Sequence, residues 1–176
     1  MSRKRKDEIE RPIAIDHERK WDESRVLTSK TDLNGIIEYA NDEFIIVSGY
    51  EDYELITKPH SIIRHPDMPK VIFKMLWDNL HAGHTFQALI KNMAKSGEYY
   101  WVMVYFECGR NENKEITQYL SNSWSIYSTS IIEQVDPLYK NLVEVEKLGG
   151  VAESEKYLSF FLNVIGKTYV QYIHAI

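Results

Sequence analysis

The stretch from residue 85 to residue 128 constrains the fold most, because it holds three extended segments in a row, joined by turn residues. In "TFQALIKNM" the side chains alternate, so that Phe86, Ala88, Ile90 and Asn92 share one face. The turn "KSG" leads into the aromatic and β-branched "EYYWVMVYFEC", and the polar loop "GRNENKE" leads into "EITQYLSNSWSIYS". This pattern predicts three successive antiparallel strands.

Ahead of these strands, the sequence predicts a β-hairpin and then short helices. "VLTSKTDLNGIIEYAN" is typical of two strands around a turn, since its Asp, Asn and Gly residues tolerate left-handed backbone. Asn41 is suited to cap the next helix and Gly49 to end it. Apolar residues at three- and four-residue steps predict a further helix from Pro69 to Leu80. A short charged helix is also expected over residues 17–27.

Two helices are expected after the strands, over residues 132–148 and 153–174, separated by Gly149 and Gly150. The second of them carries a broad apolar stripe, made of Leu158, Phe161, Leu162, Ile165, Tyr169, Tyr172 and Ile173. A stripe of this width either folds back over the chain's own sheet or contacts another molecule. The sequence leaves both interpretations open.

Composition and charge exclude several classes of protein. The net charge of −5 argues against a general nucleic-acid binder, because phosphate backbones require a concentrated positive face. The single cysteine excludes a disulfide within one chain and fits a reducing cytoplasm. No apolar run is long enough for a membrane span, the basic start lacks the apolar core of a signal peptide, and no catalytic or metal-binding motif occurs. We therefore expect a cytoplasmic protein that is not an enzyme.

Several segments together resemble a known family. They are "TDLNGIIEYANDEF", "SGY", "KPHSIIRHPDMPK", "KN", "KSGEYYWV" and "VDPLYKNL", between about Thr31 and Tyr139. In order and spacing they are similar to the PAS domain of the Aer-like family of aerotaxis and energy-taxis receptors. The resemblance implies an α+β PAS fold, with a five-stranded antiparallel sheet, short helices over one face, and flanking helices at both ends. The domain organisation expected is a disordered tail at 1–16, a PAS sensor domain with an N-terminal cap helix at 17–130, and C-terminal helices for dimer or partner contact at 131–176.

The resemblance also implies that the domain binds FAD non-covalently. The flavin-binding residues of the family correspond here to Arg64 and His65 of "RHPDMP" and to Asn92 of "KN". The chemistry is suitable, because a forked guanidinium fits a pyrophosphate and a buried amide fits the edge of the isoalloxazine ring. Asp67 is expected mainly to cap the following helix and hold the loop. His60 is interpreted as a surface loop residue.

Five further residues bear on the shape of the expected pocket. Phe86 stands where the family carries a tryptophan, and Ala88 replaces a glycine, which adds a methyl group. Trp77 matches a tryptophan of the family, although its helical spacing also fits plain core packing. Asn122 and Trp124 share a face of the last strand and are expected to reshape the pocket.

These features predict a cytoplasmic redox or energy sensor. Because the chain ends soon after the PAS core, its signal is expected to pass to a separate, membrane-bound chemotaxis transducer, and the protein is expected to form a homodimer. Two alternatives remain open at this point. One is a gas sensor that holds haem through His81 or His84, and the other is a PAS domain without ligand that serves only for protein docking.

Overall fold

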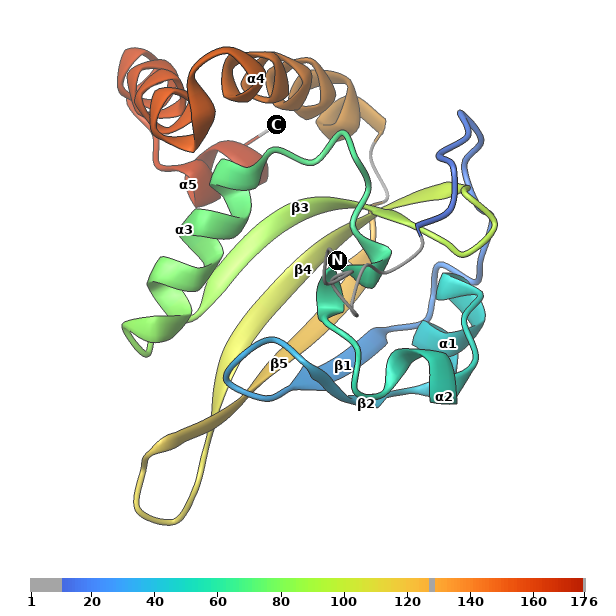
Figure 1. The fold of residues 1–176 in the computed structure, drawn as a ribbon. Helices are drawn as coiled ribbons and strands as arrows, with labels where there is room; N and C mark the ends of the chain where they lie inside the picture. Colours follow the sequence, from blue (N-terminus) through green and yellow to red (C-terminus); the bar gives the residue numbers. More distant parts are fainter. Residues whose placement is uncertain (1–10, 127–128, 176) are drawn as a thin grey trace, which may run out of the picture.

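The computed structural model describes residues 11–126 and 129–175, and the elements below refer to these residues. Five strands form one antiparallel sheet in the order β2-β1-β5-β4-β3 (Figure 1). The strands are β1 (Leu27–Thr31), β2 (Ile37–Ala40), β3 (Phe86–Met93), β4 (Tyr99–Arg110) and β5 (Ile116–Ser125). The predicted hairpin and the three later strands are confirmed. The predicted end of the last strand, at 127–128, and most of the predicted tail, at 1–10, lie outside the described residues.

Short helices cover one face of this sheet (Figure 1). They are α1 (Asp42–Ser48), α2 (Asp52–Leu55), the 3₁₀ helix η1 (His60–Ile63) and α3 (Lys70–His81). The predicted ends of α1 are confirmed: the Asn41 side chain accepts a hydrogen bond from the Phe44 N–H at 3.0 Å, and Gly49 ends the helix with a φ of 71°. Glycine adopts this left-handed backbone conformation with less strain than any other residue.

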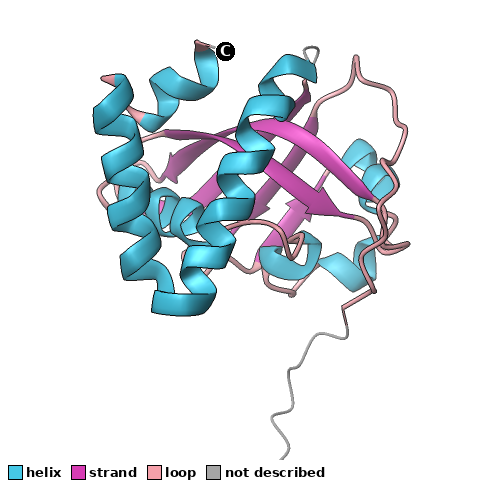
Figure 2. Cartoon of the chain, turned by 90° about the horizontal axis from the view of Figure 1, so that it is seen from above, coloured by secondary structure: helices cyan, strands magenta, loops and turns pink. Residues whose placement is uncertain are grey.

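The C-terminal helices fold back onto the same domain. α4 (Thr129–Ile165) is two helical segments that meet at Gly150, where φ is 77°, and α5 (Tyr169–His174) follows after a break. The two segments of α4 run antiparallel beside each other (Figure 2), α4 lies against α3, and α5 lies against β3. Leu158 and Ile173 of the predicted apolar stripe are buried in the core cluster of the domain. Most of the stripe therefore packs on the chain's own core, and Ile165 remains exposed.

The predicted helix over residues 17–27 is wrong. Residues 17–19 pair with the start of β4, where the Arg19 N–H donates to the Tyr99 carbonyl at 2.7 Å and the Tyr99 N–H donates to the His17 carbonyl at 2.9 Å. Residues 23–25 form a turn ahead of β1. Trp21 is the only large apolar residue of this segment before the first strand, and it packs on the core from a partly buried position. A short helix with so narrow an apolar face gains little from packing, so pairing with the sheet prevails.

Candidate functional site

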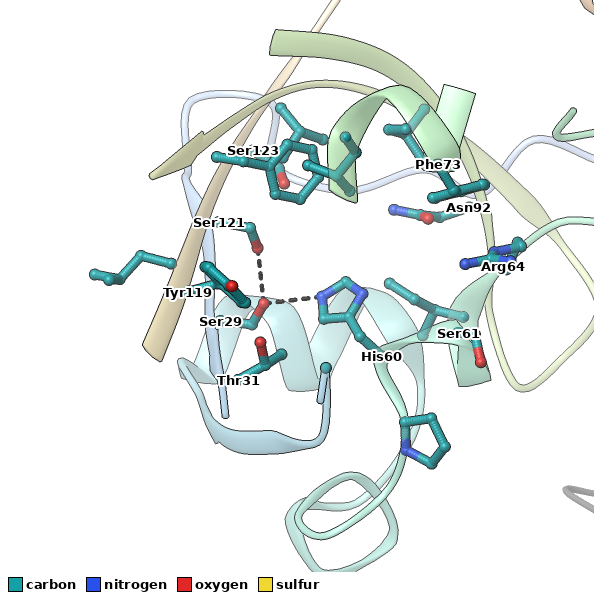
Figure 3. Close-up of a pocket in the computed structure, with 18 of the residues that line it drawn as sticks. Ser29, Thr31, His60, Ser61, Arg64, Phe73, Asn92, Tyr119, Ser121 and Ser123 are labelled. Atoms are coloured by element: carbon teal, nitrogen blue, oxygen red, sulfur yellow. Dashed lines mark hydrogen bonds between the residues drawn. The ribbon is translucent and has the colours of Figure 1, made fainter. Parts of the chain in front are cut away.

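A cavity of about 300 Å³ lies between the sheet and the helices that cover it. Residues of β1, β3, β4 and β5 form its floor, and residues of α1, η1 and α3 form its roof (Figure 3). Its lining includes Leu27, Ser29, Thr31, Phe44, His60, Ser61, Arg64, Phe73, Trp77, Ile90, Asn92, Val104, Phe106, Tyr119, Ser121 and Ser123. A concave, largely apolar site with a few convergent polar groups is typical of small-molecule binding.

Arg64 and Asn92, two of the residues predicted to bind a cofactor, lie together at one end of the cavity (Figure 3). Arg64 follows η1, and its backbone bridges to that of Asn92 on β3. The guanidinium lies 3.6 Å from the centre of the Phe73 ring, a cation–π contact, and its Nε atom is buried without a hydrogen-bond partner. Burial, followed by the charge of Arg11, lowers the pKa of Arg64 to about 10. Within residues 11–126 and 129–175, Arg64 forms no ion pair.

A row of hydrogen bonds joins His60 to the floor of the cavity. The Ser29 hydroxyl lies 2.9 Å from His60 Nε2 and 2.7 Å from the Ser121 hydroxyl (Figure 3). Burial, followed by the charge of Arg64, lowers the pKa of His60 to about 4, so the imidazole is neutral near pH 7. His60 is therefore part of the cavity wall, and its interpretation as a surface loop residue is wrong.

Trp77 closes another side of the cavity. Its ring lies edge-on to Tyr119, with ring centres 5.6 Å apart, and both residues line the cavity. Gly35 passes beneath the indole with a φ of 78°, and a Cβ atom there would lie 3.0 Å from the ring. The turn of the first hairpin thus requires glycine for two reasons: the positive φ, and the close approach of the indole, which leaves no room for a Cβ atom. Trp77 therefore packs against the core and also forms part of the cavity wall.

His65 and Asp67, two predicted site residues, lie outside the cavity lining. The buried His65 ring accepts a hydrogen bond at Nδ1 from the Asp67 N–H, at 3.1 Å, and lies edge-on to Tyr99. The Asp67 carboxylate binds Lys91 Nζ at 2.8 Å. The prediction that Asp67 caps α3 is wrong, because Pro69 occupies the N-cap position and has no side-chain hydrogen bond.

Phe86, Asn122 and Trp124 also lie away from the cavity. Phe86 is buried at the far end of β3, where it stacks on Tyr169 of α5 with ring centres 5.9 Å apart. Asn122 pairs across the sheet with Thr28 and binds its hydroxyl at 2.9 Å, and Trp124 is 40% exposed. Because side chains alternate along a strand, the two lie on the opposite face from Ser121, and the expectation that they reshape the pocket is wrong.

The histidines proposed for haem are likewise not in the lining. His81 packs on Trp77 from the end of α3, with ring centres 5.5 Å apart, and His84 is exposed. The lining histidine is His60, whose Nε2 atom is already engaged by Ser29. In the part of the chain that the structure describes, no three His, Cys, Asp or Glu side chains are arranged to hold a metal ion.

Comparison with known proteins identifies a protein family with this fold. Residues 37–122 match the family model of the PAS fold. Over 119 residues the chain is 40% identical to the aerotaxis receptor of Escherichia coli (strain K12), an alignment that covers 66% of this chain and 22% of the receptor. The chain thus spans less than a quarter of that relative. Among the helices within the described ranges, none combines the length and the apolar character that a membrane crossing requires.

Solved structures agree on the fold. A light-oxygen-voltage domain studied with a flavin analogue matches with a TM-score of 0.57 at 16% identity, covering 65% of this chain and 89% of that one. The light-state LOV domain of the blue-light photoreceptor aureochrome1 matches with a TM-score of 0.55 at 17% identity, covering 62% and 91%. A PAS domain from Colwellia psychrerythraea matches with a TM-score of 0.53 at 20% identity, covering 57% and 86%.

The fold, the cavity and the family match together define a PAS domain in this chain, of which residues 37–122 match the family model. The identity with the aerotaxis receptor places this domain, more narrowly, in the Aer-like group that the sequence motifs indicated.

Proposed function

We propose that this chain is a redox sensor that binds FAD, with the isoalloxazine ring in the cavity, and that it signals to a chemotaxis transducer. Support comes from the likeness to an aerotaxis receptor and from the fold shared with a domain studied with a flavin analogue. A bound flavin supplies reversible reduction, which changes the charge and hydrogen bonding of its ring. The residues of the chain bind and orient that ring and respond to the change.

Arg64 is the observation that carries this proposal. The Arg64 guanidinium packs on Phe73, has a buried Nε without a hydrogen-bond partner, and forms no ion pair within the described ranges. Its partial burial is costly, because a charge without a partner is removed from water. An anionic ligand group at this end of the cavity would offset the cost. The pyrophosphate of FAD is such a group, and the forked guanidinium matches it in charge and geometry.

The size and lining of the cavity are compatible with a flavin ring. A volume of about 300 Å³ is at the lower end of the range for small-molecule sites, which suits the ring, while the rest of FAD would extend past Arg64. Ala88 is fully buried and is not in the lining, so its additional methyl group does not narrow the cavity. Asn92 is 8% exposed beside Arg64, where its amide can both donate to and accept from a ring edge.

The test is reconstitution with FAD, followed by absorbance and by titration of the dissociation constant. Arg64→Ala should weaken FAD binding about 10- to 150-fold, the equivalent of about 1.5–3 kcal/mol for a charge-assisted hydrogen bond. Arg64→Lys should restore only part of it, because the forked geometry is lost. The matched control is Arg25→Ala, an exposed arginine that pairs with Asp22.

Each outcome decides a different part of the proposal. Wild-type protein that takes up no FAD would overturn the cofactor assignment, and a Soret band in the purified protein would favour haem instead. An Arg64→Ala variant that binds FAD as tightly as the Arg25→Ala control would overturn the role of Arg64 alone.

A further inference from the structure

The segment between η1 and α3 is attached to β3, which is an edge strand of the sheet. Arg64, at the start of the segment, bridges to Asn92 through the backbone, and both side chains line the cavity (Figure 3). Further along, the Lys91 N–H donates to the Met68 sulfur at 3.2 Å. The Lys91 ammonium binds the Asp67 carboxylate at 2.8 Å. The segment is therefore held on β3 at its start and again near its end.

The Lys91 side chain lies on the opposite face of β3 from Asn92, because side chains alternate along a strand. Its Nζ atom lies 4.5 Å from the centre of the Tyr99 ring and 6.0 Å from that of Trp101, both on β4. The side chain is only 10% exposed and is not in the cavity lining. Its ammonium is thus fixed between a carboxylate and two aromatic rings, away from the ligand.

Arg64 is a side chain that needs to be held in place. Across the two described ranges it forms no ion pair, and removing an unpaired charge from water is unfavourable. The contact with Phe73, at 3.6 Å, offsets part of this cost. If the segment were free, the guanidinium would turn toward solvent whenever the cavity held no anion. A group that is already in its binding position binds more tightly, because the ligand does not have to order it.

We propose that Lys91 is a positioning residue of the cofactor site: through Asp67 it fixes the segment that carries Arg64, and so keeps the guanidinium at the cavity before a ligand enters. This role rests on the proposed binding of FAD. The ion pair acts on the ligand only through Arg64. Without it, a fraction of the molecules should hold Arg64 away from the cavity, and the apparent affinity should fall with the competent fraction.

The first measurement is the dissociation constant of FAD in the wild type, Lys91→Met, Arg64→Ala and the double variant. Lys91→Met should weaken binding about 2- to 10-fold. In the Arg64→Ala background it should have no further effect, because residues that act as one unit are not additive. Lys91→Arg keeps the charge and should retain most of the affinity. Asp67→Asn, at a side chain that is 43% exposed, should match Lys91→Met and replaces it if Lys91→Met does not fold.

The matched control is Lys95→Met. The Lys95 ammonium binds the Glu54 carboxylate at 2.7 Å and lies 5.8 Å from the centre of the Tyr50 ring, so its contacts are of the same kind as those of Lys91. All three residues lie outside the cavity lining. The affinity for FAD should be unchanged in this variant.

The second measurement uses the protein without cofactor. Phenylglyoxal modifies accessible arginine side chains, and mass spectrometry locates the modified residue. The reference within the same molecule is Arg25, whose side chain is 59% exposed. Relative to Arg25, modification of Arg64 should become at least about twofold faster in Lys91→Met, because the guanidinium is then released, and should not change in Lys95→Met.

The outcomes separate this inference from the proposed function. Wild-type protein that binds no FAD would overturn the proposed function, and modification of Arg64 would still decide whether Lys91 holds it. Normal FAD binding that Lys91→Met and Asp67→Asn leave unchanged, or weaken equally with and without Arg64, would overturn the positioning role. So would an unchanged rate of Arg64 modification in Lys91→Met.

Discussion

Replacing Glu146 with alanine should destabilise the domain by about 1–2 kcal/mol, because this α4 side chain caps the pocket helix α3. Its two carboxylate oxygens accept hydrogen bonds from the backbone N–H groups of Lys70 and Val71, each at 2.9 Å. Pro69, at the N-cap position, supplies no side-chain bond. Loss of an N-cap costs about 0.5–2 kcal/mol and hydrogen bonds to a charged group about 1.5–3 kcal/mol. Partial exposure of Glu146 places the expected loss in the lower part of these ranges.

Urea denaturation, followed by circular dichroism, measures this loss as a shift in the midpoint at constant slope. Glu146→Gln should lose about half as much, since one oxygen can still accept while the charge near the helix start is removed. The control is Glu144→Ala on the same helix. Glu144 is 67% exposed and pairs with Lys147, an ion pair of the kind worth very little.

Equal midpoints for Glu146→Ala and Glu144→Ala would refute the reasoning. A loss of helix content in Asp67→Ala that exceeds the loss in Glu146→Ala would also refute it, because the Asp67 side chain binds Lys91 and does not cap α3.

Two further predictions concern buried polar groups. Because burial and then the charge of Arg64 lower the pKa of His60 from 6.5 to about 4, the unfolded chain binds more protons between these values. The free energy of unfolding should therefore rise by about 3 kcal/mol from pH 4 to pH 6.5 through this group. Urea titrations across that interval measure the rise. If His60→Gln shows the same dependence of the free energy of unfolding on pH, the lowered pKa of His60 is contradicted. Tyr139→Phe should lower the free energy of unfolding by about 1–3 kcal/mol in the same assay, because the buried Tyr139 hydroxyl donates to the Leu89 carbonyl at 2.8 Å. The control is Tyr172→Phe, which loses a longer and only part-buried hydrogen bond. Equal losses in the two variants would argue against a strong Tyr139 bond.

The sheet and the short helices were predictable because their signals are local. The hairpin turn at Gly35, the cap at Asn41 and the apolar steps of α3 each depend on residues within one element. The cap of α3 was not predictable in this way. It comes from Glu146, which is 76 residues from Lys70 in sequence, whereas Asp67 was the nearest suitable side chain.

The candidate site was predictable in part for the same reason. Arg64 and Asn92 were identified from short motifs and do meet in the cavity. On β5 the alternation was interpreted correctly, but the face assigned to the pocket was wrong: Asn122 and Trp124 were expected there, whereas Ser123 lines the cavity. The choice depends on the register with β4, where Ser123 pairs with Val104, a long-range fact. His60 was missed because its partner Ser29 lies 31 residues away.

The C-terminal helices are attached to two elements that line the cavity, β3 and α3. The Tyr139 hydroxyl of α4 and the Tyr169 hydroxyl of α5 bond the backbone of Leu89, on the free edge of β3, three residues before Asn92. Glu146 holds the first turn of α3, the helix that carries Phe73 and Trp77 into the cavity. The free energy of allosteric coupling between two sites is typically about 1–3 kcal/mol, which equals the net contribution of one or two such hydrogen bonds. A displacement of β3 or α3 large enough to break either attachment would therefore change how α4 is held.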